Sequence, residues 1–186
     1  MADLVVLTDR GTRPSAVRLL LAEAAALLLE SAGPHPDVAA CRRRADVVLH
    51  GLGDWEERRL ASRDALRLLS QELALGQAAE GMARIAARIV ALPRPLTGSA
   101  DLLEAVRPLL EGLSDPAAIP ETRGLDGVRR LRERAVAQLG SAPWPRSVGT
   151  FLGSTAAIHR LEEAAELAFT AANLLHVAAG DAELVA

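Results

Sequence analysis

Residues 16–31 carry apolar side chains almost all round a helix, which is the pattern of a helix buried on most of its sides. Gly33, Pro34 and Pro36 follow and cannot continue a helical hydrogen-bond ladder. Since 50% of the residues are hydrophobic but only 2% are aromatic, the core must be built from alanine, leucine and valine. Alanine, leucine, arginine and glutamate lose little rotamer freedom in a helix, so the composition favours an all-α protein.

The rest of the chain repeats this pattern. Apolar residues recur at three- and four-residue spacing between proline- and glycine-rich segments, which predicts amphipathic helices. We expect them at about residues 16–31, 37–51 with a continuation to 62, 64–92, 101–113, 128–139 and 147–179. Ser15 and Asp37 are predicted to cap the first two helices, and Pro108 is predicted to bend the fourth.

The two halves of the chain resemble each other. When they are aligned, Leu75, Glu80 and Ile89 fall on Leu161, Glu166 and Leu175. Each unit alone cannot easily bury its apolar faces, so we expect two pseudo-repeated three-helix bundles that form a six-helix assembly. The expected divisions are an N-terminal extended segment (1–14), a first three-helix repeat (15–95) and a second three-helix repeat (96–186).

The charge and the cysteine count exclude several classes of function. A net charge of −3 gives no basic field for nucleic acid, and the absence of lysine excludes a P-loop. Cys41 is the only cysteine, so neither an intramolecular disulfide nor a CxxC metal site can form. We find no signal peptide and no apolar run that could span a membrane, and we expect a cytoplasmic protein.

One face of the last predicted helix could bind a metal ion. It carries His159, Glu162, Glu163 and Glu166, followed by Thr170 and Asn173. Side chains three and four residues apart project together, and carboxylates with an imidazole suit iron, manganese or zinc, while carboxylates alone suit magnesium or calcium. The alternative is an ordinary solvated face of an amphipathic helix. In the first half the equivalent position carries Glu80, with Glu72 two turns earlier and Gly76 between them.

The arginine clusters at 42–44 and 129–134 could bind an anionic surface or a phosphorylated partner, because guanidinium groups match such oxygens. The alternative is solvated helix faces paired with Asp46, Asp54 and Glu133. His35, His50 and His176 are isolated. The sequence has no GxSxG, HExxH or ExxH motif. Residues 8–13 have some character of a nucleotide-contacting turn, as in helical-bundle adenosyltransferases.

Residues 73–86 and 161–173 resemble the motif of leucine, acid, three residues and acid on the third helix of each repeat in the PhoU family of phosphate-uptake regulators. The layout agrees over roughly residues 15–180. In the second motif Glu162 and Glu166 keep the spacing of the acids, with Ala165 in place of a glycine. In the first motif Glu80 matches and Gly76 replaces the other acid.

The resemblance implies a regulator or adaptor of phosphate transport and signalling, not an enzyme. Its partners would be phosphate transporter components or a sensor kinase, reached by protein contact, with peripheral membrane association through those partners and with no nucleic acid. It implies a divalent or iron-type metal held by Glu162, Glu166 and Glu80, and the helix spacing adds His159. Two alternatives stay open: a metal-free helical interaction module, and a bundle enzyme that uses a nucleotide near residues 8–13.

Overall fold

The structure, a computed structural model, describes residues 14–60, 66–94, 96, 98–122, 125–141 and 148–183. These residues form α-helices and contain no strand, so the all-α prediction is confirmed for this part of the chain. The helices are α1 (Ala16–Ala32), α2 (Val38–Leu60), α3 (Leu66–Val90), α4 (Ala100–Ser114), α5 (Asp126–Ser141) and α6 (Val148–Glu183). Their bounds agree with the sequence pattern to within about one helical turn. Within these ranges no helix is both long and apolar enough to cross a bilayer.

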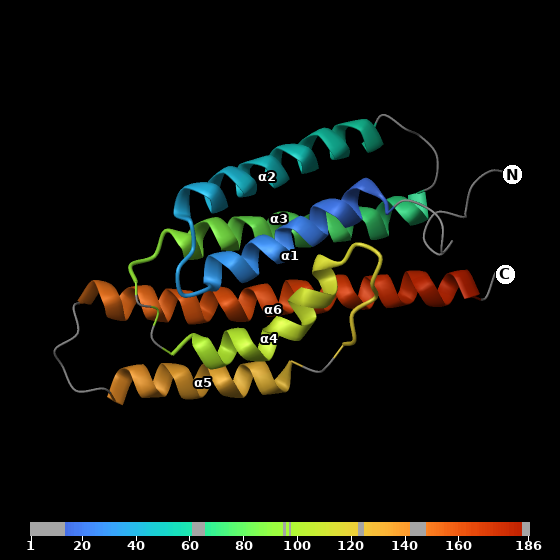
Figure 1. Cartoon of the computed structure of the whole chain (residues 1–186). Coiled ribbons are helices and arrows are strands. Elements are labelled where there is room, and N and C mark those ends of the chain that lie inside the picture. The colour runs from blue at the N-terminus through green and yellow to red at the C-terminus, as the bar shows by residue number, and fades with distance from the viewer. Residues whose placement is uncertain are drawn as a thin grey trace, which may run out of the picture.

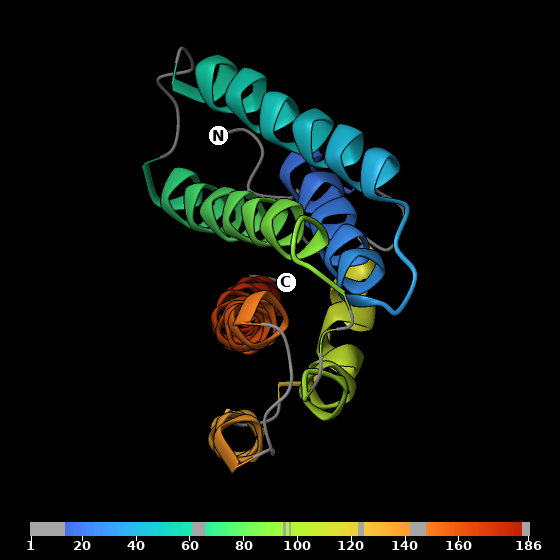
Figure 2. The same ribbon diagram turned by 90° about the vertical axis from the view of Figure 1, so that its left-hand side faces the viewer.

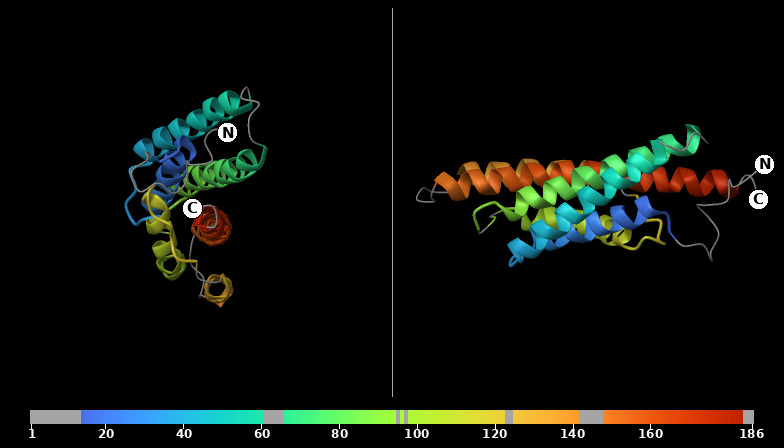
Figure 3. Two further views of the ribbon diagram at one scale, coloured as in Figure 1. Left: turned by 90° about the vertical axis from the view of Figure 1, so that its right-hand side faces the viewer. Right: turned by 90° about the horizontal axis from the view of Figure 1, so that it is seen from above.

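The helices pack in two neighbouring sets. In one set α1, α2 and α3 contact each other, in the other α4, α5 and α6 do, and the sets meet where α1 packs on α4 and α3 packs on α6. Figure 1 shows α2 and α5 on opposite outer sides, and Figure 2 shows the same order seen end-on. The long helix α6 runs along nearly the whole molecule (Figure 3), and its first turns extend past the ends of α2 and α3 (Figure 1). Residues 1–13, which belong to the predicted N-terminal extended segment, lie outside the described residues.

Small side chains allow the central helices to approach closely. The residues that α6 buries are mostly alanines: Ala157, Ala164, Ala165, Ala168, Ala171 and Ala172. On α3, alanines alternate with larger apolar residues such as Met82 and Ile89, which are fully buried. Gly81 of α3 lies against a side chain of α6, because a β-carbon there would lie 2.5 Å from Leu167 Cδ1. The joint between the two sets therefore depends on the absence of side-chain bulk.

The two outer helices are attached differently. The helix α2 buries a continuous stripe at alternating four- and three-residue spacing, namely Cys41, Ala45, Val48, Leu52 and Trp55. The stripe of α5 has three buried members, Val128, Ala135 and Leu139, and Leu131 and Val136 pack against the core as partly buried residues. Burial of apolar area is the main favourable term in packing, so α5, with fewer fully buried apolar residues, is held with less hydrophobic surface than α2.

The predicted helix ends are correct in part. The Asp37 carboxylate caps α2, since Oδ1 accepts a hydrogen bond of 2.9 Å from the Ala40 N–H. Ser15 stands at the N-cap position of α1 as predicted, but its side chain makes no capping hydrogen bond: the hydroxyl is buried without a partner, and the backbone oxygen accepts from the Leu19 N–H. Pro108 lies inside α4, which changes direction along its length (Figure 1).

The connection between α4 and α5 is anchored at two points. The Arg18 guanidinium on α1 donates to the Ala118 carbonyl at 2.8 Å, and His176 Nε2 on α6 lies 2.8 Å from the Pro120 carbonyl oxygen. Pro120 also packs on Gly112 of α4, where a β-carbon would lie 2.6 Å from Pro120 Cβ and 3.2 Å from its backbone Cα. Glycine is required at position 112 because the backbone of the connection lies against it.

This close contact makes Gly112 a sensitive position. We expect Gly112→Ala to lower the free energy of unfolding by about 1–3 kcal/mol, because the connection must move away from α4. In Gly53→Ala the new methyl group meets nothing within 4 Å, so this control should stabilise the protein by about 0.5–1 kcal/mol through helix propensity alone. Urea unfolding followed by circular dichroism measures both. Equal stabilisation by the two substitutions would show that the connection does not rest on α4.

Candidate functional site

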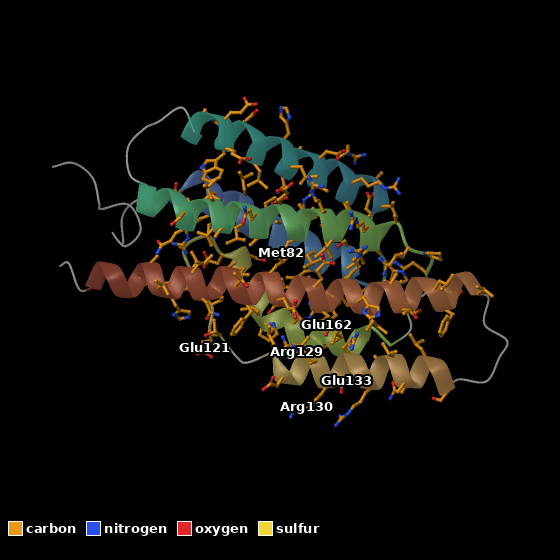
Figure 4. All side chains as sticks on the ribbon, turned by 180° about the vertical axis from the view of Figure 1, so that it is seen from behind. Met82, Glu121, Arg129, Arg130, Glu133 and Glu162 are labelled. Carbon is orange, nitrogen blue, oxygen red and sulfur yellow. The ribbon has the colours of Figure 1, made fainter. Side chains whose placement is uncertain are left out.

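The acidic face of α6 predicted from the sequence lies against α5. Arg132 Nε is 3.1 Å from Glu162 Oε2, and Arg129 Nη2 is 3.4 Å from Glu166 Oε1. Figure 4 shows Arg129 between α5 and α6 on the side of Glu162, whereas Arg130 points away from α6. The two carboxylates that the resemblance assigns to metal binding are therefore paired with arginines of the neighbouring helix.

The two ion pairs differ in their surroundings. The Glu162 side chain is only 22% exposed, and that of Arg132 is 34% exposed, while Arg129 and Glu166 are both more than half exposed. Arg132 Nε is buried and close to the carboxylate, but its N–H makes no hydrogen bond. The contact is therefore an attraction between charges without a directed hydrogen bond, and it leaves one buried donor unsatisfied.

The other side chains predicted to bind a metal ion lie either beside the Arg132–Glu162 pair or away from it. His159 Nδ1 is 4.0 Å from Glu162 Oε2, which makes it the nearest of them. Glu80 on α3 binds Arg84 at 2.5 Å, one turn along its own helix. Glu72, which the sequence places two turns before Glu80, is buried. Among the described residues, no three His, Cys, Asp or Glu side chains are grouped as a metal ion would require.

The arginine clusters have other partners than the sequence suggests. Arg44 binds Glu23 at 2.7 Å and also pairs with Glu30, so it joins α2 to α1. Hydrogen bonding to Glu23 raises the pKa of Arg44, with burial acting in the opposite direction. Asp54 lies 3.9 Å from His50 on its own helix. Within the two clusters, as far as the structure describes them, four exposed arginines have no ion pair: Arg42, Arg43, Arg130 and Arg134.

A second cluster of polar side chains lies near the connection between α1 and α2. Cys41 is fully buried, and burial followed by the charge of Glu30 raises the pKa of its thiol. Arg94 donates to the backbone carbonyls of Gly33 (2.9 Å) and Ser31 (2.5 Å), so it satisfies the free carbonyls at the end of α1. This geometry supports a structural role in which Arg94 holds the chain that follows α3 against the end of α1.

Large apolar side chains are exposed at the start of α6. Val148 is 58% exposed, Phe151 41% and Leu152 59%, and their three- and four-residue spacing places them on one side of the helix. They lie in the part of α6 that extends past α2 and α3 (Figure 1). The sequence places these residues in the last predicted helix but does not indicate whether they are buried or exposed. Only the packing of the other helices reveals that nothing among the described residues covers them.

No family model matches the chain, and no curated protein or solved structure matches it.

The different burial of the two ion pairs can be measured. In a double-mutant cycle of Arg132→Gln with Glu162→Gln we expect a coupling free energy of about 1 kcal/mol, because this pair is shielded from water. The same cycle of Arg129→Gln with Glu166→Gln should give at most about 0.5 kcal/mol, since this pair is solvated. Urea unfolding of the single and double variants supplies the values. A larger coupling for the exposed pair would contradict the arrangement of α5 on α6.

Proposed function

We propose that the protein is a non-catalytic helical adaptor, similar to the PhoU-family regulators, and that it acts by contact with a protein partner. The observation that carries the proposal is the exposed apolar surface of Val148, Phe151 and Leu152 at the start of α6. Neighbouring large apolar side chains that stay in contact with water are typical of interaction sites, because covering them releases water at little entropic cost to the protein.

The position of this surface supports the proposal. The first turns of α6 extend past α2 and α3, so a partner can contact them without displacing those helices (Figure 1). Phenylalanine is one of the residue types enriched at protein interfaces, and Leu152 adds an aliphatic contact beside it. The contact would therefore have an apolar centre supplied by a single rigid helix.

The charged residues support an adaptor in preference to an enzyme. Glu162, Glu166 and Glu80 are each neutralised by an arginine, which lowers their availability as acids, bases or ligands. We therefore place the metal-free form of the adaptor first. Metal binding by Glu162, Glu166, Glu80 and His159 stays a prediction that elemental analysis of the purified protein can decide. The proposed nucleotide contact at residues 8–13 lies outside the described residues.

The packing also supports the proposed internal repeat. The contacts among α1, α2 and α3 have counterparts among α4, α5 and α6, and α2 corresponds to α5 as the outer helix. A repeat of this kind presents two similar sets of helical faces to partners. By its resemblance to the PhoU family, we infer that these partners are the components of a phosphate transporter or a sensor kinase.

The proposal is tested by co-expression with the phosphate transporter subunits and the sensor kinase encoded in the same genome. Tagged wild-type protein should retain one of these partners. We expect the double variant Phe151→Asp with Leu152→Asp to lose at least about tenfold in affinity, because charge is introduced at the centre of an apolar contact. Val47→Asp is the matched control, since Val47 is 68% exposed on α2 and lies outside the surface.

The control separates a specific contact from a loss of folding. All variants should keep the helical circular dichroism of the wild type. If the wild-type protein binds neither the transporter subunits nor the kinase, the PhoU-like role is wrong. If Val47→Asp weakens binding as much as the double variant, the start of α6 is not the contact surface.

A further inference from the structure

We propose that α5 is a releasable helix, which opens away from α4 and α6 while the other helices remain folded. The first observation is its small buried surface. Val128, Ala135 and Leu139 of α5 are buried and Leu131 and Val136 are partly buried against the core, whereas the other outer helix, α2, buries a five-residue stripe that includes Trp55. Segments with few buried apolar contacts open locally at a lower free energy than the core of a protein.

The charged contacts of α5 do not compensate for this difference. The Arg129–Glu166 pair is solvated on both sides, so it adds little. The Arg132–Glu162 pair is more shielded, but the buried Arg132 Nε–H has no hydrogen-bond acceptor. Opening would allow water to satisfy that donor, which offsets part of the attraction that is lost.

Glycines at both ends of α5 lower the stability of this helix. Gly127 lies in its first turn and Gly140 in its last turn, and a β-carbon at either position would meet nothing within 4 Å. Close packing therefore does not explain either glycine. A glycine inside a helix is less favourable than alanine because more backbone entropy is lost when it is ordered.

The anchored connection allows α5 to move without the other helices. Arg18 on α1 holds Ala118, and His176 on α6 holds Pro120. Only residues 121–125 separate Pro120 from the first residue of α5. Opening of α5 can therefore begin after these two anchors, so the packing of α4 on α1 and α6 is kept.

Release of α5 would change the surface of α6. Glu162 and Glu166 would lose their arginine partners and become free carboxylates on a helix that also carries the apolar residues covered by α5. The surface of α6 would then have two states, one neutralised and one acidic. Opening of α5 depends only on how α5 is attached, and not on the proposed adaptor function.

The test is native-state hydrogen exchange of the full chain at increasing low concentrations of urea, resolved by segment. We expect amides of α5 to exchange at least about tenfold faster than amides of α1 and α3, with a weak dependence on urea that reflects a small exposed surface. Amides of α1 and α3 should show the strong dependence of global unfolding. A common rate and a common urea dependence for α5, α1 and α3 would overturn the proposal.

Two variants test the cause. Glu162→Gln should speed exchange in α5 about fivefold or more, because Arg132 loses its partner. Its control is Glu163→Gln, since Glu163 binds Arg160 within α6 at 2.8 Å and should leave α5 unchanged. Gly140→Ala should slow exchange in α5 about two- to fivefold by stabilising the helix. Equal effects of Glu162→Gln and Glu163→Gln, or faster exchange in Gly140→Ala, would contradict the mechanism.

Discussion

The close approach of alanine- and glycine-rich helix faces is the constraint on which the rest of this structure depends. The chain has almost no aromatic residues to fill space, so its helices must come near each other to exclude water. The alanines of α6 and the glycine at position 81 of α3 make this possible where the two sets of helices meet. Larger residues such as Met82 and Ile89 fill the space that remains between the helices. The helices α1 and α3 form the centre of the bundle.

This constraint explains why ion pairs help to attach the outer helices. Small side chains provide little hydrophobic area per residue, so the outer helices gain attachment from ion pairs to the helix beneath them. Arg44 joins α2 to Glu23 and Glu30, and Arg132 joins α5 to Glu162. The difference is that the apolar stripe of α2 is buried along its length, whereas that of α5 is buried only in part. The acidic face of α6 is accordingly part of the attachment of a helix, whatever further role it has.

The sequence predicts the elements well and the site poorly, for physical reasons. Helix bounds follow from local signals, because Gly33 and Pro34 interrupt a backbone ladder and Asp37 caps the next helix through a contact three residues away. Ion-pair partners depend on which helices become neighbours. The row of Glu162 and Glu166 was therefore visible in the sequence, but its pairing with α5 was not. The missing side-chain bond of the Ser15 cap and the exposure of Phe151 were not visible in the sequence for the same reason, since tertiary packing decides both.

The contact between α3 and α6 at Gly81 is the most direct test of this account. In a Cys41→Ala background, Gly81→Cys and Leu167→Cys should place two sulfur atoms within bonding reach, because a β-carbon at position 81 lies 3.6 Å from Leu167 Cγ. We expect mild oxidation to form a disulfide between positions 81 and 167 in the folded monomer, detected by mass spectrometry after proteolysis. The same pair with Gly53→Cys in place of Gly81→Cys should stay reduced. Two free thiols in the folded double variant would contradict the close joint between the two sets of helices.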